Sequence, residues 1–193
     1  MKVAFVIYNN MTALDFVGVY DPVVRLQTMG FFPDLIWEIC ADTEVVSDSA
    51  GLRFLPTQVK PSLQAFDLVI VPGGITALVY QLTRDREFVD WLKTAAPCPL
   101  IASVCTGSLL LGAAGFLKDK AATTHPNAFE ELKEFCGNVV DQRVVDEGSV
   151  ITARGVTASI DLGLYLCERL ASYAAKEKIR QQMDYQTSVA ECL

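Results

Sequence analysis

The sequence predicts a single α/β domain, a three-layer sandwich in which helices cover both faces of a mostly parallel central sheet. Two patterns predict this fold class. Several short, continuous apolar runs are typical of parallel strands that are buried on both faces. The segments between these runs carry apolar residues at helical spacing, and strands that alternate with helices favour a layered α/β domain. No linker, repeat or low-complexity stretch interrupts the 193 residues, so we expect one domain over residues 1–193.

The expected elements follow one another along the chain in a regular order. Residues 3–8 are all apolar or aromatic and predict the first buried strand. A helix is expected at residues 12–29, where Thr12 and Asp15 match a capping pattern ahead of an apolar-periodic stretch. Further strands are expected at residues 35–40, 68–71 and 100–104. Further helices are expected at residues 86–95, 106–114, 128–135, 157–173 and 174–185.

Two hairpins and one long uncharged segment complete the predicted layout. Asp146-Glu147-Gly148 separates two short apolar runs and indicates a hairpin turn, and a second hairpin is expected across residues 45–55. Residues 94–117 carry no charge and are numerous enough to cross a bilayer. However, Pro97 and Pro99 interrupt the start of this segment and glycines interrupt the rest. A buried strand, a tight turn and a buried helix therefore explain it better than a membrane span.

Charge and histidine content narrow the classes of function. With 16 basic and 23 acidic residues the net charge is −7, and no basic stripe is present. Nucleic acids and anionic membrane surfaces are therefore not expected as partners. The single histidine, His125, excludes a metal site built from two histidines, and we expect no metal and no organic cofactor.

The cysteines favour a reducing compartment. Six cysteines are scattered along the chain without a C-x-x-C pair, and the apolar run after Lys2 is too short for a secretion signal. We therefore expect a cytoplasmic protein with reduced thiols. The six are Cys40, Cys98, Cys105, Cys136, Cys167 and Cys192.

Cys105 lies where a nucleophile is expected. An apolar strand leads into Ser103-Val104-Cys105-Thr106-Gly107, and an apolar helix follows directly, as in the strand-to-helix turn called a nucleophile elbow. The start of a helix has a positive potential, which would lower the pKa of the thiol and favour the thiolate. The alternative interpretation is a buried structural cysteine, which suits Cys40 and Cys167 better.

Two other segments end or follow strands at the same predicted edge of the sheet. Gly73 and Gly74 close the strand at residues 68–71, and their N–H groups could stabilise an oxyanion, although an ordinary turn would look the same. Asp15, just after the first strand, could act as a general acid or base, or could simply cap its helix. Because ligands of α/β sheets bind beyond the carboxyl ends of the strands, we expect these segments and Cys105 to share one crevice. His125 could assist Cys105 or be a loop histidine bonded to backbone.

In this order, Val71-Pro72-Gly73-Gly74, the Cys105 turn and Thr123-Thr124-His125 resemble the ThiJ/PfpI superfamily over nearly the whole chain. The resemblance implies a flavodoxin-like fold of the class I glutamine amidotransferase type and a homodimer. Three segments look most like isonitrile hydratases and also resemble the amidase-like domain of AraC-type regulators. They are residues 14–21, 103–115 and 155–161.

The hydratase resemblance implies roles for individual residues. Cys105 would be the nucleophile and Asp15 its acidic partner, and the N–H groups of Gly74 and Thr106 would be oxyanion donors. Gly73, His125 and Val156 would line the substrate pocket.

Three residues differ from the patterns of particular branches of the superfamily, and these differences affect which activity is expected. Thr106 stands where protease-like members have a histidine after the nucleophile, and Asp15 stands where the chaperone-like members have glutamate. Arg154 interrupts a run where hydratases have glycines, so it could reshape the pocket.

The expected activity is the addition of water to an isonitrile, which gives an N-substituted formamide through a cysteine thioimidate. Two alternatives stay open. One is a glyoxalase-like or deglycase-like enzyme that uses Cys105 on reactive aldehydes, and the other is a non-catalytic protein whose Cys105 senses oxidative stress. All three predict a small-molecule ligand or oxidant rather than a macromolecular substrate.

Overall fold

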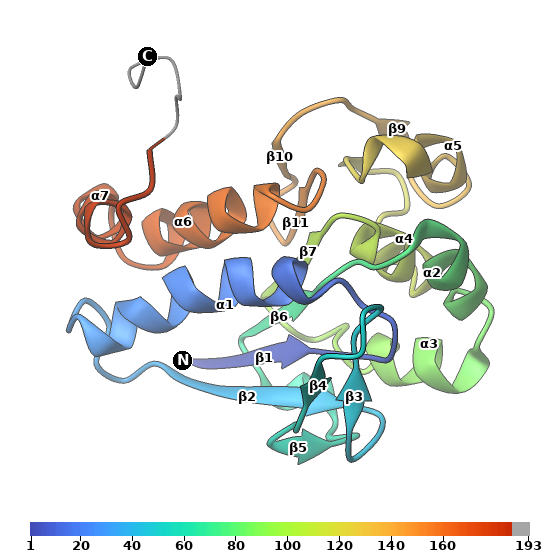
Figure 1. Ribbon diagram of the computed structural model, residues 1–193. Coiled ribbons are helices and arrows are strands. Elements are labelled where there is room, and N and C mark those ends of the chain that lie inside the picture. The colour runs from blue at the N-terminus through green and yellow to red at the C-terminus, as the bar shows by residue number, and fades with distance from the viewer. Residues whose placement is uncertain (187–193) are drawn as a thin grey trace.

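The structure is a computed structural model that describes residues 1–186. Its centre is a seven-stranded sheet in the order β10-β11-β7-β6-β1-β2-β5 (Figure 1). Every neighbouring pair is parallel except β10 with β11, so the predicted α/β class with a mostly parallel sheet is confirmed. The strands are β1 (Lys2–Val6), β2 (Ile36–Ala41), β5 (Gln58–Val59), β6 (Leu68–Val71), β7 (Leu100–Val104), β10 (Val144–Asp146) and β11 (Val150–Ala153).

Helices cover the sheet in two layers. On one side α1 packs against α6, and α6 packs against α7; on the other, α4 packs against α2, α3 and α5 (Figure 1). The helices are α1 (Ala13–Thr28), α2 (Thr76–Leu82), α3 (Arg86–Lys93), α4 (Gly107–Ala113), α5 (Phe129–Leu132), α6 (Ala158–Leu170) and α7 (Tyr173–Gln182). The central strands β1, β6 and β7 are almost entirely buried, as continuous apolar runs require.

The sequence predicted most of these elements and missed some short ones. Both hairpins are present, one as β10 with β11 and the other as β3 (Val46–Ser47) with β4 (Arg53–Phe54). The helix expected at residues 128–135 is shorter, a 3-10 turn at Pro126–Ala128 followed by the single turn of α5. Helix α2 and the two-residue strands β5 and β9 (Asn138–Val139) were not predicted as elements, because segments so short carry no clear periodicity. Strand β8 (Ala121–Ala122), which pairs with β9, lies where a short strand is expected just ahead of His125.

The uncharged segment folds as expected into strand β7, a turn and helix α4. Among residues 1–186, no helix has both the length and the apolar character needed to cross a membrane. Among residues 1–186 five cysteines are free, and four of them are buried. Cys192 lies outside the described residues.

Close contact between α1 and α6 sets the position of the first helix, which carries Asp15. A Cβ on Gly18 would lie 2.8 Å from the Cβ of Ser159, closer than real side chains come. The Ser159 hydroxyl is fixed by a 2.8 Å hydrogen bond to the Val156 carbonyl, so it cannot easily move away. The backbones of the two helices approach closely because residue 18 has no side chain.

The Gly18 contact predicts a compensating pair of substitutions. Gly18→Ala is expected to destabilise the fold by about 1–3 kcal/mol through overpacking. Ser159→Gly alone should cost about 0.5 kcal/mol in helix propensity. Together they should cost less than the sum, because the second change removes the atoms that the new methyl group meets. Urea unfolding of the four proteins measures this coupling, and strictly additive costs would contradict the contact.

Candidate active site

Cys105 sits on a strained turn between β7 and α4. Its φ is 55°, in the left-handed region that side chains with a Cβ seldom adopt. The turn is held from several directions: the Cys105 N–H donates to the carbonyls of Ala153 and Arg154 at 3.0 and 2.9 Å. The Cys105 carbonyl accepts from the hydroxyls of Thr124 and Ser108 at 3.0 and 3.2 Å. The sequence therefore placed the elbow correctly, and strand β11 and the Thr124 loop hold its backbone.

The Gly73-Gly74 turn lies directly against Cys105. A Cβ on Gly73 would lie 2.5 Å from the Thr106 nitrogen and 2.8 Å from the Cys105 Cβ, so only glycine permits this approach. The N–H of Gly74 donates to the Thr106 hydroxyl at 2.9 Å, and the same hydroxyl bonds to the Gly74 carbonyl at 2.9 Å. The two expected oxyanion donors are thus neighbours, but the Gly74 N–H is engaged by the Thr106 side chain.

Asp15 reaches the glycine turn from the first turn of α1. It is fully buried, and its Oδ2 accepts the N–H of Gly73 at 3.0 Å. Its Oδ1 accepts no hydrogen bond from the protein as described. The capping interpretation is wrong in this respect, because Thr12, at the start of α1, makes no side-chain cap and the Asp15 carboxyl faces the glycine turn instead.

Burial and proximity set the charges of Asp15 and Cys105. Desolvation raises the pKa of Asp15 from 3.8 to about 7, although its contacts with the Cys105 side chain and the Gly73 N–H oppose this. Desolvation and the Asp15 charge raise the pKa of the Cys105 thiol to about 12, although the Thr106 N–H lowers it. The expectation of a thiol with a lowered pKa is therefore wrong. Burial beside a carboxylate raises the pKa more than the positive potential at the start of a short helix lowers it. Near neutral pH the pair holds a thiol beside a partly ionised carboxyl.

Tyr8 is a site residue that the sequence did not reveal. Its hydroxyl donates to the Pro72 carbonyl at 2.9 Å and so supports the turn that carries both glycines. Burial raises the pKa of Tyr8, and the charges of Asp15 and Cys105 raise it further, which shows that the phenol shares their environment. In the sequence Tyr8 ends a buried apolar run, where it looks like any core aromatic residue.

The loops that carry His125 and Arg154 lie beside the elbow. His125 is half-buried, its Nδ1 accepts the N–H of Asn127 at 3.2 Å, and its ring packs against Gly155. The His125 side chain makes no other hydrogen bond to residues 1–186, Cys105 included.

Arg154 and Val156 occupy the segment after β11. The Arg154 side chain pairs with Asp141 at 2.6 Å and lies over the ring of Phe129, while its carbonyl holds the Cys105 N–H. Val156 is half-buried against the core. Within the described chain, no group of three or more His, Cys, Asp or Glu side chains is arranged to hold a metal ion.

The geometry brings a cysteine thiol, a carboxyl group and backbone N–H groups together in a buried part of the fold. The four residues that supply them come from three separate segments, and contacts or charge effects link each of them to another: Asp15, Gly73, and the adjacent pair Cys105 and Thr106. An ionised Asp15 could take the thiol proton as sulfur attacks, and it could return that proton to a substrate atom.

The chain is similar to known proteins over most of its length. The model of the DJ-1/PfpI family matches residues 1–169. The chain is 35% identical over 187 residues to a protein named isonitrile hydratase from Pseudomonas putida, covering 96% of this chain and 78% of that protein. It is 29% identical over 146 residues to Protein DJ-1alpha of Drosophila melanogaster, covering 74% of this chain and 67% of that protein. A crystal structure of a THiJ/PfpI family protein from Pseudomonas syringae superimposes with a TM-score of 0.85 at 30% identity, covering 97% of this chain and 76% of that one.

Proposed function

The chain belongs to the DJ-1/PfpI family, and from this premise we propose that it is an isonitrile hydratase-like enzyme that converts an isonitrile into an N-substituted formamide. The observation that carries the proposal is the buried pair of Cys105 and Asp15, with Thr106 after the nucleophile. The similarity to the Pseudomonas putida hydratase over 96% of the chain supports the same substrate class.

The proposed reaction begins with Cys105. Its sulfur bonds to the terminal carbon of R–NC while ionised Asp15 takes the thiol proton and delivers it to that carbon, giving the thioimidate R–N=CH–S–Cys105. A pKa of about 7 suits this exchange, because Asp15 can then both accept and release a proton near neutral pH.

Water completes the reaction at the same carbon. Asp15 removes a proton from the water as oxygen bonds to the carbon, and nitrogen is protonated to give R–NH–CH(OH)–S–Cys105. The carbon–sulfur bond then breaks, sulfur recovers a proton, and R–NH–CHO leaves. One water is consumed, and no electron transfer is needed.

A comparison of substrates tests the proposal. Purified protein is offered cyclohexyl isonitrile or methylglyoxal in ¹⁸O-labelled water, and the products are followed by mass spectrometry. The hydratase predicts N-cyclohexylformamide with one ¹⁸O. Consumption of methylglyoxal alone would favour the aldehyde-directed alternative. If both compounds survive while peroxide adds two oxygens to Cys105, the redox-sensor alternative is favoured; the raised pKa of Cys105 argues against it, because the thiolate is the reactive form.

His125 is expected to shape the pocket rather than to transfer protons. Its Nδ1 is occupied by the Asn127 N–H, and its ring packs on Gly155. We therefore predict that His125→Ala keeps kcat near the wild-type value and changes mainly KM. A general acid or base would instead contribute about 10²–10⁴-fold. Steady-state kinetics of the wild type and of His125→Ala measure kcat and KM. A loss in kcat of about 10²–10⁴-fold would favour a Cys–His mechanism.

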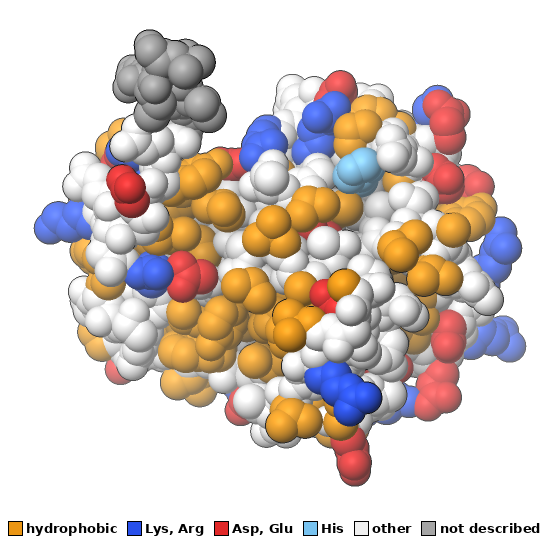
Figure 2. All heavy atoms as spheres, in the orientation of Figure 1, with side chains coloured by type: hydrophobic (Ala, Val, Ile, Leu, Met, Phe, Trp, Pro, Cys, Tyr) orange, Lys and Arg blue, Asp and Glu red, His pale blue; other side chains and the backbone are white. Residues whose placement is uncertain are grey.

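We also propose that the protein is a cytoplasmic homodimer acting on a small molecule. Hydrophobic side chains gather around α1 (Figure 2), where Leu14 and Val17 are exposed. Leu52 and Leu55 of the neighbouring β3–β4 hairpin region are exposed as well, so a second copy could bury apolar surface there. The free cysteines fit a reducing compartment. Sedimentation velocity measures the proposed dimer.

A further inference from the structure

Tyr8 and Asp15 form hydrogen bonds to the two ends of one peptide group. The Tyr8 hydroxyl donates to the carbonyl of Pro72 at 2.9 Å, and the next backbone N–H, that of Gly73, donates to Asp15 Oδ2 at 3.0 Å. The Pro72 carbonyl and the Gly73 N–H belong to the same planar amide. A hydrogen bond received by the carbonyl polarises the amide and makes its N–H a stronger donor. The phenol is therefore linked to the carboxyl group through the backbone.

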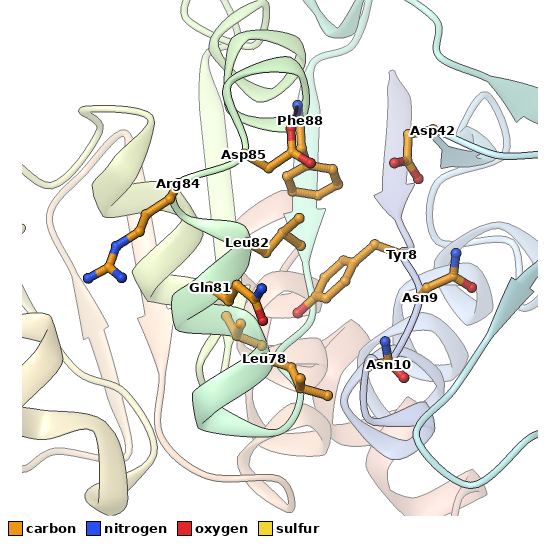
Figure 3. Close-up of a pocket in the computed structure, with 11 residues that line it drawn as sticks. Tyr8, Asn9, Asn10, Asp42, Leu78, Gln81, Leu82, Arg84, Asp85 and Phe88 are labelled. Carbon is orange, nitrogen blue, oxygen red and sulfur yellow. Dashed lines mark hydrogen bonds between the residues drawn. The ribbon is translucent and has the colours of Figure 1, made fainter.

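Packing fixes the position of the Tyr8 side chain. The side chain extends from the end of β1 to the chain that leaves β6, with Phe88 and Leu82 beside its ring (Figure 3). The rings of Tyr8 and Phe88 meet edge to face with their centroids 5.6 Å apart, and both are buried. The phenol hydroxyl is thus held against the Pro72 carbonyl by contacts that do not involve the hydroxyl itself.

The Pro72 carbonyl has little freedom to move. On α4, a Cβ at Gly107 would come within 2.7 Å of the Pro72 oxygen, so the backbones of the turn and the helix approach closely there. The next carbonyl, that of Gly73, accepts the N–H of Thr12 at 2.8 Å. Because these contacts do not depend on Tyr8, loss of its hydroxyl should change the polarity of the Pro72–Gly73 amide more than the path of the chain.

Two titratable side chains face Asp15, and both stay uncharged where it ionises. Burial and the Asp15 charge raise the pKa of the Cys105 thiol to about 12, and burial raises the pKa of the Tyr8 phenol well above its ordinary value. On α6, which packs against α1, Asp161 is paired with Arg143. No lysine, arginine or histidine of the described chain is among the groups that shift the pKa of Asp15. That pKa depends on burial, on the Cys105 side chain and on the Gly73 N–H.

We propose that Tyr8 is a positioning residue for Asp15: through the Pro72–Gly73 amide it fixes the direction of the Gly73 N–H and strengthens that group as a donor to the carboxylate. A stronger donor favours the ionised carboxyl, which is the form that accepts the thiol proton in the reaction proposed above. The consequence for turnover rests on the proposed hydratase function, whereas the effect on the ionisation of Asp15 does not.

Tyr8→Phe tests the proposal, because it removes the hydroxyl and keeps the packed ring. The pKa of Asp15 should rise by about half a unit, since the Gly73 N–H becomes a weaker donor. Titration by ¹³C NMR of protein labelled at the aspartate carboxyl carbons measures this, and the Asp15 resonance is identified by its absence from Asp15→Asn. Tyr20→Phe is the matched control. Tyr20 lies on α1, its ring also packs among aromatic residues, and its hydroxyl is not bonded to this amide, so the pKa of Asp15 should not change.

A stronger phenol donor should act in the opposite direction. Replacement of Tyr8 by 3-fluorotyrosine gives a more acidic phenol of nearly the same shape, so the pKa of Asp15 should fall. A residue that only filled space would not shift this pKa in opposite directions. The proposal is wrong if Tyr8→Phe fails to raise the pKa of Asp15 or if 3-fluorotyrosine fails to lower it. If Tyr8→Phe does not fold, the fluorinated protein decides.

Isonitrile turnover separates this proposal from the function on which it partly rests. If Asp15 carries the protons, the pH at which kcat/KM rises should move upward in Tyr8→Phe by the same amount as the pKa of Asp15. A shifted pKa without a shifted pH profile, or without any isonitrile turnover by the wild type, would support the role of Tyr8 and contradict the proposed hydratase mechanism.

Discussion

Replacing Cys105 by alanine is expected to lower isonitrile turnover by about 10⁴-fold or more, because the thioimidate can no longer form. The buried crevice offers no substitute nucleophile, since the other described cysteines lie elsewhere in the fold. The fold should persist, because alanine removes one sulfur atom and the hydrogen bonds that hold the turn come from backbone groups of residue 105. Formamide production followed by mass spectrometry measures the loss, and circular dichroism verifies the fold.

A matched change elsewhere controls for the loss of a thiol. Cys136 is half-buried and follows α5, outside the crevice, so Cys136→Ala should keep the wild-type rate. A Cys105→Ala protein that still hydrates isonitriles at a comparable rate would remove covalent catalysis from the proposal. Appearance of a mass increase equal to one isonitrile on wild type, and its absence on Cys105→Ala, would identify the intermediate directly.

Replacing Asp15 by asparagine is expected to reduce turnover by about 10²–10⁴-fold while leaving the crevice intact. An asparagine oxygen can still accept the Gly73 N–H, so the glycine turn keeps its position. What is lost is the group that moves protons between sulfur, carbon and water. In wild type, kcat/KM should rise as pH passes through about 7, where Asp15 ionises, and Asp15→Asn should lack this rise. Equal pH profiles in the two proteins would show that Asp15 is not the proton carrier.

Asp15→Asn should also raise the free energy of unfolding at pH 8, although it lowers activity. Because burial raises the pKa of Asp15 from 3.8 to about 7, the folded state binds its proton more tightly than the unfolded state does. The wild type therefore loses stability as pH rises from about 4 to about 7, and above that range the loss reaches about 4 kcal/mol at most. Asparagine has no such charge, so Asp15→Asn should be more stable than wild type at pH 8 and similar to it near pH 4. Urea unfolding at the two pH values measures this, and a variant less stable at pH 8 would contradict the buried carboxylate.

Local patterns in the sequence were sufficient to predict the main elements and to predict that Cys105, Asp15 and the glycine turn lie together. Continuous apolar runs predicted the central strands β1, β6 and β7, and the turn of small residues around Cys105 predicted the elbow. The rule that ligands meet the carboxyl ends of parallel strands brought Cys105, Asp15 and the glycine turn to one edge, as the structure does. Helix α2 escaped prediction because its seven residues follow the glycine turn without a side-chain cap.

The sequence by itself determined the family and the order of most strands and helices along the chain, and it predicted that Cys105, Asp15 and the Gly73-Gly74 turn lie together. Only the tertiary structure decided the state of those groups: a thiol whose pKa is raised rather than lowered, a Gly74 N–H bonded to Thr106, and a Tyr8 hydroxyl that holds Pro72. The physical reason is the distance along the chain over which each property is set, since strand and helix patterns depend on residues that are neighbours in the sequence. A pKa, a hydrogen-bond partner or a cavity depends on burial and charge supplied by segments far apart in the sequence.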